Sequence, residues 1–195
     1  MTVTVLGGAL SLLAVSCGGG GGDSEEAEDN PRPTTTERET TTSTLDPEEA
    51  ARQEVIAARE AADEALLDAM APPAPDPEHP AIAETYTGLM LDRMLDTANG
   101  LKRNGFAIRL PADSEHRVEV DSVRFDTVDG QEVAFLEVCT VDDSERFVVG
   151  TGEVLSEGVK TVAATEAMRR VDGTWKLAER RENENLEGVA GCAAD

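Results

Sequence analysis

The chain has 195 residues, and its 40 Asp and Glu residues outnumber 17 Lys and Arg residues to give a net charge of -23. This charge excludes proteins that bind nucleic acid, because they need basic surface to displace cations from phosphates. No apolar run approaches the roughly 20 residues of a membrane-spanning helix. The part of the chain after residue 45 has the size of one domain.

An apolar run of the length of a secretory signal core occupies residues 3–16 and ends in small side chains directly before Cys17. The segment LAVSC resembles a bacterial lipobox, in which the cysteine is lipidated on its sulfur and becomes the first residue of the mature chain. We therefore expect a signal peptide over residues 1–16 and a lipid anchor on Cys17. The opening MTVTV differs from most signals in having neither Lys nor Arg.

Residues 17–45 are rich in Gly, acidic residues and Thr, and they contain almost no apolar side chains. Such a segment cannot bury enough surface to offset its chain entropy. We expect it to form a disordered tether between a domain at residues 46–195 and the extracytoplasmic face of the cell membrane. Its seven threonines between Thr34 and Thr44 are either glycosylated, as in the stalks of exported proteins, or bare.

Two amphipathic helices open the domain. Asp46 and Pro47 form a helix start, because Asp caps the first turn and Pro fits the first helical position. Apolar residues then recur at helical spacing, which predicts a helix over residues 46–70. The five prolines of residues 71–80 end this helix. A second apolar stripe predicts a helix over residues 86–103, which the following Asn-Gly pair ends.

The apolar period then changes from helical to alternating, which is typical of strands. Turn residues separate short segments rich in Val, Phe and Thr. The predicted strands are residues 106–110, 116–125, 131–141, 145–155, 160–171 and 174–182. The predicted hairpin turns are Asp129-Gly130, Glu157-Gly158 and Asp172-Gly173. Helices followed by hairpin-linked strands predict an α+β fold, in which helices cover one face of a mainly antiparallel sheet.

The order of these elements and the last hairpin, MRRVDGTWKLAER, resemble the nuclear transport factor 2-like (ketosteroid isomerase-like) superfamily. The resemblance covers residues 46–182 and implies a curved sheet of about six strands wrapped round a long helix as a cone. It also implies that Trp175 enters the core. The chain looks particularly like small exported lipoproteins of this superfamily, in which a Thr-rich tether precedes the domain.

Cys139 and Cys192 remain as an even pair when Cys17 carries lipid. We expect them to form a disulfide, because the compartment outside the membrane is oxidising. A metal site is disfavoured, since the only histidines are His79 and His116 and no Cys pair has metal-ligand spacing. A catalytic thiol is disfavoured because Cys139 lies within a strand pattern.

Three carboxylates fall on apolar faces of predicted strands. Glu166 shares its face with apolar residues of the strand 160–171, Glu137 does so in the strand 131–141, and Glu179 does so in the strand 174–182. If such a face lines the cavity of the cone, burial would raise the pKa of the carboxyl and make a general acid or base. The alternative is that these strands show both faces to water, and no second titrating group lies at a spacing that names a mechanism.

The remaining candidates for the cavity are aromatic. Tyr86 is the only tyrosine and Trp175 the only tryptophan, and both are expected in the core or the cavity wall. His79 and His116 are expected to be solvated. No nucleotide, metal or cofactor fingerprint occurs in the sequence, so no cofactor is predicted.

These features favour a lipid-anchored, non-catalytic protein of the cell envelope that binds a small apolar ligand or another envelope protein. Two alternatives remain open. One is an acid/base enzyme of the isomerase or dehydratase type, with a carboxylate in the cavity. The other is a structural module of a larger surface assembly.

The lipid anchor is tested by changing Cys17. The Cys17→Ala variant should leave the membrane fraction or remain unprocessed, because the sulfur that carries the lipid is lost. Fractionation followed by mass measurement of the mature chain checks this outcome. A variant that still fractionates as a processed, membrane-bound lipoprotein would contradict the lipobox interpretation.

Overall fold

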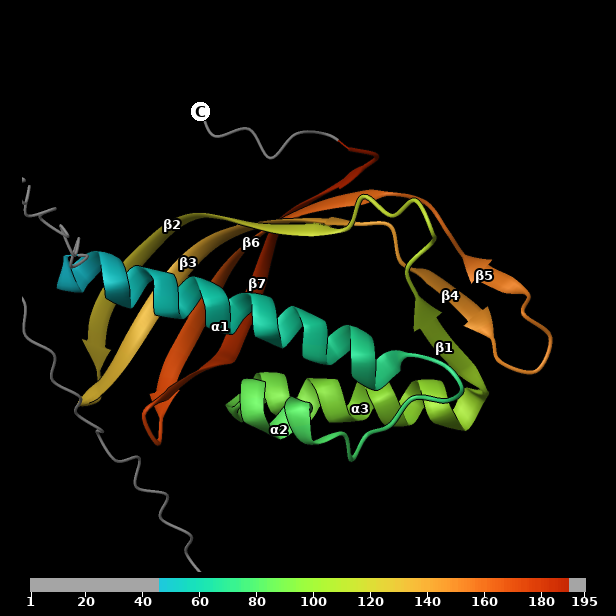
Figure 1. Cartoon of the computed structure of the whole chain (residues 1–195), viewed down its shortest axis with the longest axis horizontal. Helices are drawn as coiled ribbons and strands as arrows, with labels where there is room; N and C mark the ends of the chain where they lie inside the picture. Colours follow the sequence, from blue (N-terminus) through green and yellow to red (C-terminus); the bar gives the residue numbers. More distant parts are fainter. Residues whose placement is uncertain (1–45, 190–195) are drawn as a thin grey trace, which may run out of the picture. The chain divides into compact units, whose positions relative to one another are not determined.

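The computed structural model describes residues 46–189, which lie within one compact unit, Ser43–Asp195. The expected signal peptide, Cys17, the tether and Cys192 lie outside the described residues. Three helices precede seven strands in this part of the chain, so the fold is α+β (Figure 1). None of the described helices has the length and apolar character that crossing a membrane requires.

The helices begin and end where local signals place them. Helix α1 spans Pro47–Met70, and the side chain of Asp46 caps it by accepting a 3.0 Å hydrogen bond from the backbone N–H of Glu48. Helix α3 spans Gly88–Asn104 and ends at Gly105, whose φ of 69° suits a residue without a Cβ. Between them lies a short helix, α2, at Pro80–Thr85, which the sequence patterns did not predict.

Four long strands form one antiparallel sheet in the order β2-β3-β6-β7. Their bounds are Arg117–Val128 for β2, Gln131–Asp142 for β3, Lys160–Val171 for β6 and Thr174–Glu187 for β7. The predicted Asp-Gly turns join β2 to β3 and β6 to β7, and both residues of each turn have positive φ. These two hairpins are therefore encoded locally.

The structure contains a second sheet, which the sequence analysis did not predict. It has the order β1-β4-β5, and its strands are Phe106–Arg109, Glu145–Val148 and Val154–Ser156. The predicted strand 145–155 is broken by a turn in which Gly152 has a φ of 74°, so it folds back as a hairpin. Glu157-Gly158 consequently links two sheets and is not a hairpin turn. Residues 46–189 form seven strands in two sheets rather than about six strands in one cone.

The main core lies between α1 and the face of the four-stranded sheet that α1 crosses (Figure 1). Val55 and Ala62 of α1 pack in this core with Leu136 of β3, Met168 of β6 and Leu177 of β7. All five are at most 2% exposed. The small side chains of α1 let the helix approach the sheet closely, and this packing fixes the distance between the two layers.

The segment between α2 and α3 fastens the helices to the edge of the sheet. Tyr86 forms an isolated parallel bridge with Leu177, and the Thr87 N–H donates a 3.0 Å hydrogen bond to the Leu177 carbonyl. Lys176 Nζ donates to the Ala83 carbonyl at 2.7 Å. These contacts pair part of the outer edge of β7, which would otherwise present unpaired backbone groups.

Of the two cysteines in the predicted disulfide, Cys139 lies within the described residues and Cys192 lies outside them. Cys139 is buried on β3 with 2% exposure, and its side chain lies on the opposite face of that strand from Leu136 and Val138. The pairing of Cys139 with Cys192 stays a prediction.

Peptide mapping under non-reducing conditions should find Cys139 joined to Cys192. A bond across this loop would stabilise the fold by roughly 4 kcal/mol on the chain-entropy account, so Cys192→Ser should lower the melting temperature. Cys17→Ala is the matched control, since it should leave the mapped bond and the melting temperature unchanged. Two alkylatable thiols at these positions in the exported protein would contradict the pairing.

Candidate functional site

A cavity of about 790 Å³ lies beside the core, between α1, α3 and the strands. This volume is within the roughly 300–1,000 Å³ that small-molecule pockets occupy. Part of its wall is apolar, and that part includes Leu66, Met70, Met90, Met94, Ile108 and Leu177. The rest of its wall carries charged and hydroxyl side chains, and several of these belong to a connected network.

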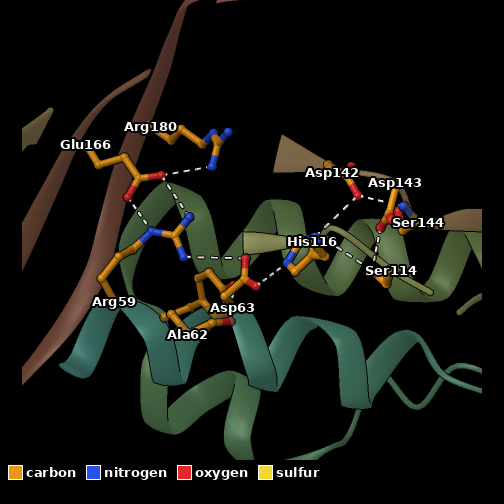
Figure 2. Close-up of polar contacts among 11 residues, drawn as sticks. Arg59, Ala62, Asp63, Ser114, His116, Asp142, Asp143, Ser144, Glu166 and Arg180 are labelled. Atoms are coloured by element: carbon orange, nitrogen blue, oxygen red, sulfur yellow. Dashed lines mark hydrogen bonds and ion pairs between the residues drawn. The ribbon is translucent and has the colours of Figure 1, made fainter. Parts of the chain in front are cut away.

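The network begins with a buried ion pair between α1 and β6. Arg59 and Glu166 are 2% and 1% exposed. Arg59 Nε donates to Glu166 Oε2 at 2.5 Å, and Nη2 donates to Oε1 at 3.2 Å (Figure 2). The contact is bidentate, which is the geometry that makes arginine a strong partner for a carboxylate.

Arg180 of β7 joins this pair from the other side. Its Nη1 donates to Glu166 Oε1 at 2.9 Å, so one carboxylate accepts from two guanidinium groups (Figure 2). Arg180 reaches Glu166 because β7 has a bulge at Ala178, where the register against β6 shifts between Ala167 and Met168. A bulge adds one residue and reverses which side chains face inward. Without it, Glu179 would take this place.

Asp63 continues the network along α1. It lies one turn after Arg59, and its Oδ1 is 3.6 Å from Arg59 Nη1. Its other oxygen, Oδ2, is 2.6 Å from His116 Nε2 (Figure 2). On the far side of the imidazole, Nδ1 lies 3.7 Å from Asp142 Oδ1 of β3, which is an ion-pair distance beyond hydrogen-bond reach. His116 therefore lies between two carboxylates, and the expectation that it is solvated is wrong.

The loop before β2 is held in place so that His116 points inward. Asp143 is 7% exposed and accepts 2.6 Å hydrogen bonds from Ser114 Oγ and from the Glu115 N–H. Ser114 Oγ also accepts from the His116 N–H at 3.1 Å. The loop thus has fixed hydrogen-bond partners for its backbone, and the imidazole keeps one orientation.

The environment holds these groups in their charged forms. Asp142 together with Asp63 raises the pKa of His116 to about 9, against the effect of burial. Burial works to raise the pKa of Asp142, but the neighbouring His116 and a hydrogen bond from the Ser144 backbone outweigh it and lower that pKa to about 2. Burial opposes the charge of Arg59, yet the attraction of Glu166 leaves its pKa above the ordinary value.

One of the four residues expected in the cavity lines it, and a second lies just behind the wall. Tyr86 lines the cavity and donates a 2.5 Å hydrogen bond from its hydroxyl to the Ala62 carbonyl. Burial raises the pKa of this phenol. Glu166 lies directly behind the lining residues Arg59 and Arg180, to which it is bonded.

The other two candidates lie elsewhere. Trp175 is buried in the main core and does not line the cavity. Glu137 is exposed on the face of β3 turned away from α1, where it accepts hydrogen bonds from Thr165 Oγ1. The expectation that Glu137 faces the cavity is therefore wrong, because in the β3 alternation it shares the face of Cys139 rather than that of Leu136.

One feature of the sequence could have revealed the buried charged residues that the sequence analysis missed. Arg59 interrupts the apolar stripe of α1 between Val55 and Ala62, and a charged residue within such a stripe is almost never fully buried unless it is paired. Among residues 46–189, no group of three or more His, Cys, Asp or Glu side chains is placed to hold a metal ion.

Comparisons with known proteins inform the fold only. No family model and no curated protein match the chain. The structure is similar to the crystal structure of the intermembrane space region of chloroplast protein ARC6, with a TM-score of 0.52 and 18% sequence identity. The match covers 71% of this chain and 97% of that chain. At this identity, the likeness shows a shared fold and no shared activity.

The His116 site predicts a dependence of stability on pH. The pKa of His116 is about 9 in the folded chain and 6.5 as its ordinary value. Its contribution is therefore fully present below pH 6.5 and is lost as the pH rises through 9. The free energy of unfolding of the unsubstituted protein should fall over this window relative to His116→Gln, by at most roughly 3 kcal/mol.

Denaturant titrations at a series of pH values measure this difference. His79→Gln is the matched control, since no ion pair to His79 occurs in the described part of the chain. It should follow the unsubstituted protein at every pH. An equal loss of stability in His116→Gln over the same window would overturn the assignment of this titration to His116.

Proposed function

We propose that this protein is a lipid-anchored protein of the cell envelope whose domain binds a small, mainly apolar molecule in the 790 Å³ cavity. The observation that carries the proposal is the division of the cavity wall. One part is apolar, and the other part carries charged side chains, several of which form ion pairs with one another. Pockets for small molecules typically combine an apolar lining with a few placed polar groups.

The apolar part of the wall can adapt to its ligand. Three of the chain's five methionines, Met70, Met90 and Met94, line the cavity. Methionine has three rotatable bonds and a polarisable sulfur, so it fits irregular apolar surfaces. A wall of this kind suits a flexible or variable apolar ligand better than a rigid one.

The pairing of the polar groups favours binding over acid/base catalysis. Both oxygens of Glu166 accept hydrogen bonds from arginines. His116 is a cation at neutral pH because its pKa is about 9, so its imidazole does not accept a proton there. The Tyr86 hydroxyl is committed to the Ala62 carbonyl. A general base needs a free lone pair within reach of the substrate and a pKa near the working pH.

Two further parts of the proposal rest on the sequence. The apolar run and the LAVSC segment support the lipid anchor at Cys17 and a place on the extracytoplasmic face of the membrane. The long α1 packed along an antiparallel sheet, and the Asp-Gly turn before Trp175, support a relation to the nuclear transport factor 2-like superfamily. Another envelope protein as the bound partner remains the second reading of the same site.

A co-purifying molecule is the direct test. Native mass spectrometry of the protein purified from its own membrane should show an added mass that denaturation releases. Met94→Trp should reduce the fraction carrying this mass by at least about tenfold, because the larger side chain fills the cavity that the ligand needs.

Leu89→Trp is the matched control for this experiment. Leu89 lies on the same helix and is 55% exposed, and it does not line the cavity. This variant should keep the added mass. A ligand-free spectrum for the unsubstituted protein, or equal loading of the Met94→Trp protein, would refute binding in this cavity.

A further inference from the structure

Three polar side-chain atoms at the cavity wall are buried and have no hydrogen-bond partner. They are Arg59 Nη1, His116 Nδ1 and Thr140 Oγ1. All three residues line the cavity. A buried polar group without a partner costs free energy, and such groups are rare in folded proteins. Half of the six such atoms among the described residues lie at this one wall, which points to something that the wall binds.

The three atoms belong to one neighbourhood. Asp63 contacts both Arg59, through Nη1, and His116, through Nε2. Thr140 and Asp142 are two residues apart on β3, so their side chains share the inward face. His116 lies beside Asp142 and directly precedes β2, in which Val118 is the register partner of Thr140. Thr140 and His116 are thus diagonal neighbours across two strands.

All three atoms can donate, and two of them belong to cations. Arg59 Nη1 donates only, and Nδ1 of a protonated His116 does the same. The Thr140 hydroxyl can turn to donate. Among the lining residues, no buried carboxylate or carbonyl side-chain oxygen lacks a partner in the described part of the chain. What the wall lacks is an acceptor.

The charge balance of the lining is nearly even, unlike that of the whole chain. Acidic residues exceed basic residues by 40 to 17 overall. In the cavity lining, Asp63, Asp96, Asp142 and Glu182 face Arg59, Arg93, His116, Arg180 and Arg181. Because the chain as a whole is strongly acidic, this nearly even lining repels an anionic group less than the average surface does.

We propose that Arg59, His116 and Thr140 form a head-group subsite for the carboxylate of an amphipathic acid whose hydrocarbon part lies along the methionines. The inference rests on the proposed function, since it names the chemical class of the ligand in the same cavity. A carboxylate matches three donors because its two oxygens accept about four hydrogen bonds. Asp63 and Asp142 orient the side chains of Arg59 and His116, but Arg59 Nη1 and His116 Nδ1 still lack a hydrogen-bond acceptor.

A substitution at Thr140 can distinguish a ligand subsite from a cluster that only stabilises the fold. Its hydroxyl has no partner in the ligand-free protein, so the nearly isosteric Thr140→Val should leave the melting temperature unchanged or raise it. The same change removes one donor to the carboxylate. A residue whose loss weakens binding without weakening the fold acts on the ligand.

Thr161 provides the matched control. It is a buried threonine on β6, and its Oγ1 donates a 2.8 Å hydrogen bond to the Gly188 carbonyl. It lies on the opposite face of the strand from the cavity residue Val162. Thr161→Val should therefore lower the melting temperature and leave ligand affinity unchanged.

The experiment uses the full chain with Cys17→Ala, so that no attached lipid competes for the cavity. Decanoate, decanol and decylamine are titrated while the methyl signals of ¹³C-methyl methionine are followed by NMR. Decanoate should shift the signals of Met90 and Met94 and bind at least about tenfold more tightly than decanol, and decylamine should bind most weakly. Thr140→Val should reduce the preference for decanoate over decanol, and Thr161→Val should keep it.

The outcomes separate this inference from the proposed function. Equal affinities for decanoate and decanol, with the methionine signals shifting, would overturn the carboxylate subsite and leave apolar binding in the cavity standing. Unchanged preference in Thr140→Val would also overturn it. Failure of all three probes to shift Met90 or Met94 would overturn both proposals.

Discussion

The buried ion pair between Arg59 and Glu166 constrains the rest of the domain. Taking each ion out of water costs several kcal/mol even after relaxation, and removing one partner typically destabilises by about 3–5 kcal/mol. The bidentate contact and the second guanidinium of Arg180 offset this cost for the carboxylate. Because Arg59 is on α1, Glu166 on β6 and Arg180 on β7, the pair also fixes where the helix lies along the sheet.

The ion pair also accounts for the polar wall that follows it. The guanidinium of Arg59 extends beyond Glu166, and Asp63 compensates its remaining charge at 3.6 Å. Asp63 in turn attracts His116, and His116 attracts Asp142. Each member neutralises the previous one, so the charges alternate in sign from the core to the cavity (Figure 2). Such a network pairs Glu166, Asp63 and Asp142 with cationic side chains and leaves donor atoms at the wall.

Local signals predicted the helices and hairpins, but contacts between distant residues decided the site. The cap at Asp46 and the two Asp-Gly turns act within a few residues, so the sequence reveals them. Arg59 and Glu166 are 107 residues apart, and His116 and Asp63 are 53 apart, so no periodicity joins them. Strict alternation along the last strand also predicted that Glu179 faces inward. The bulge at Ala178 shifts the register, so that Arg180 and not Glu179 lies opposite Glu166.

The cavity follows from the composition of the core. Aromatic residues are 3% of the chain, and half of the buried residues of α1 are alanine, so few large side chains are present to fill the space beside α3. The cavity is only partly enclosed, so water enters it when no ligand is bound. Its apolar lining then stays in contact with water at a cost of about 25 cal/mol per Å². A ligand that covers this lining removes the cost, and the charged part of the wall can hydrogen-bond either water or the polar end of a ligand.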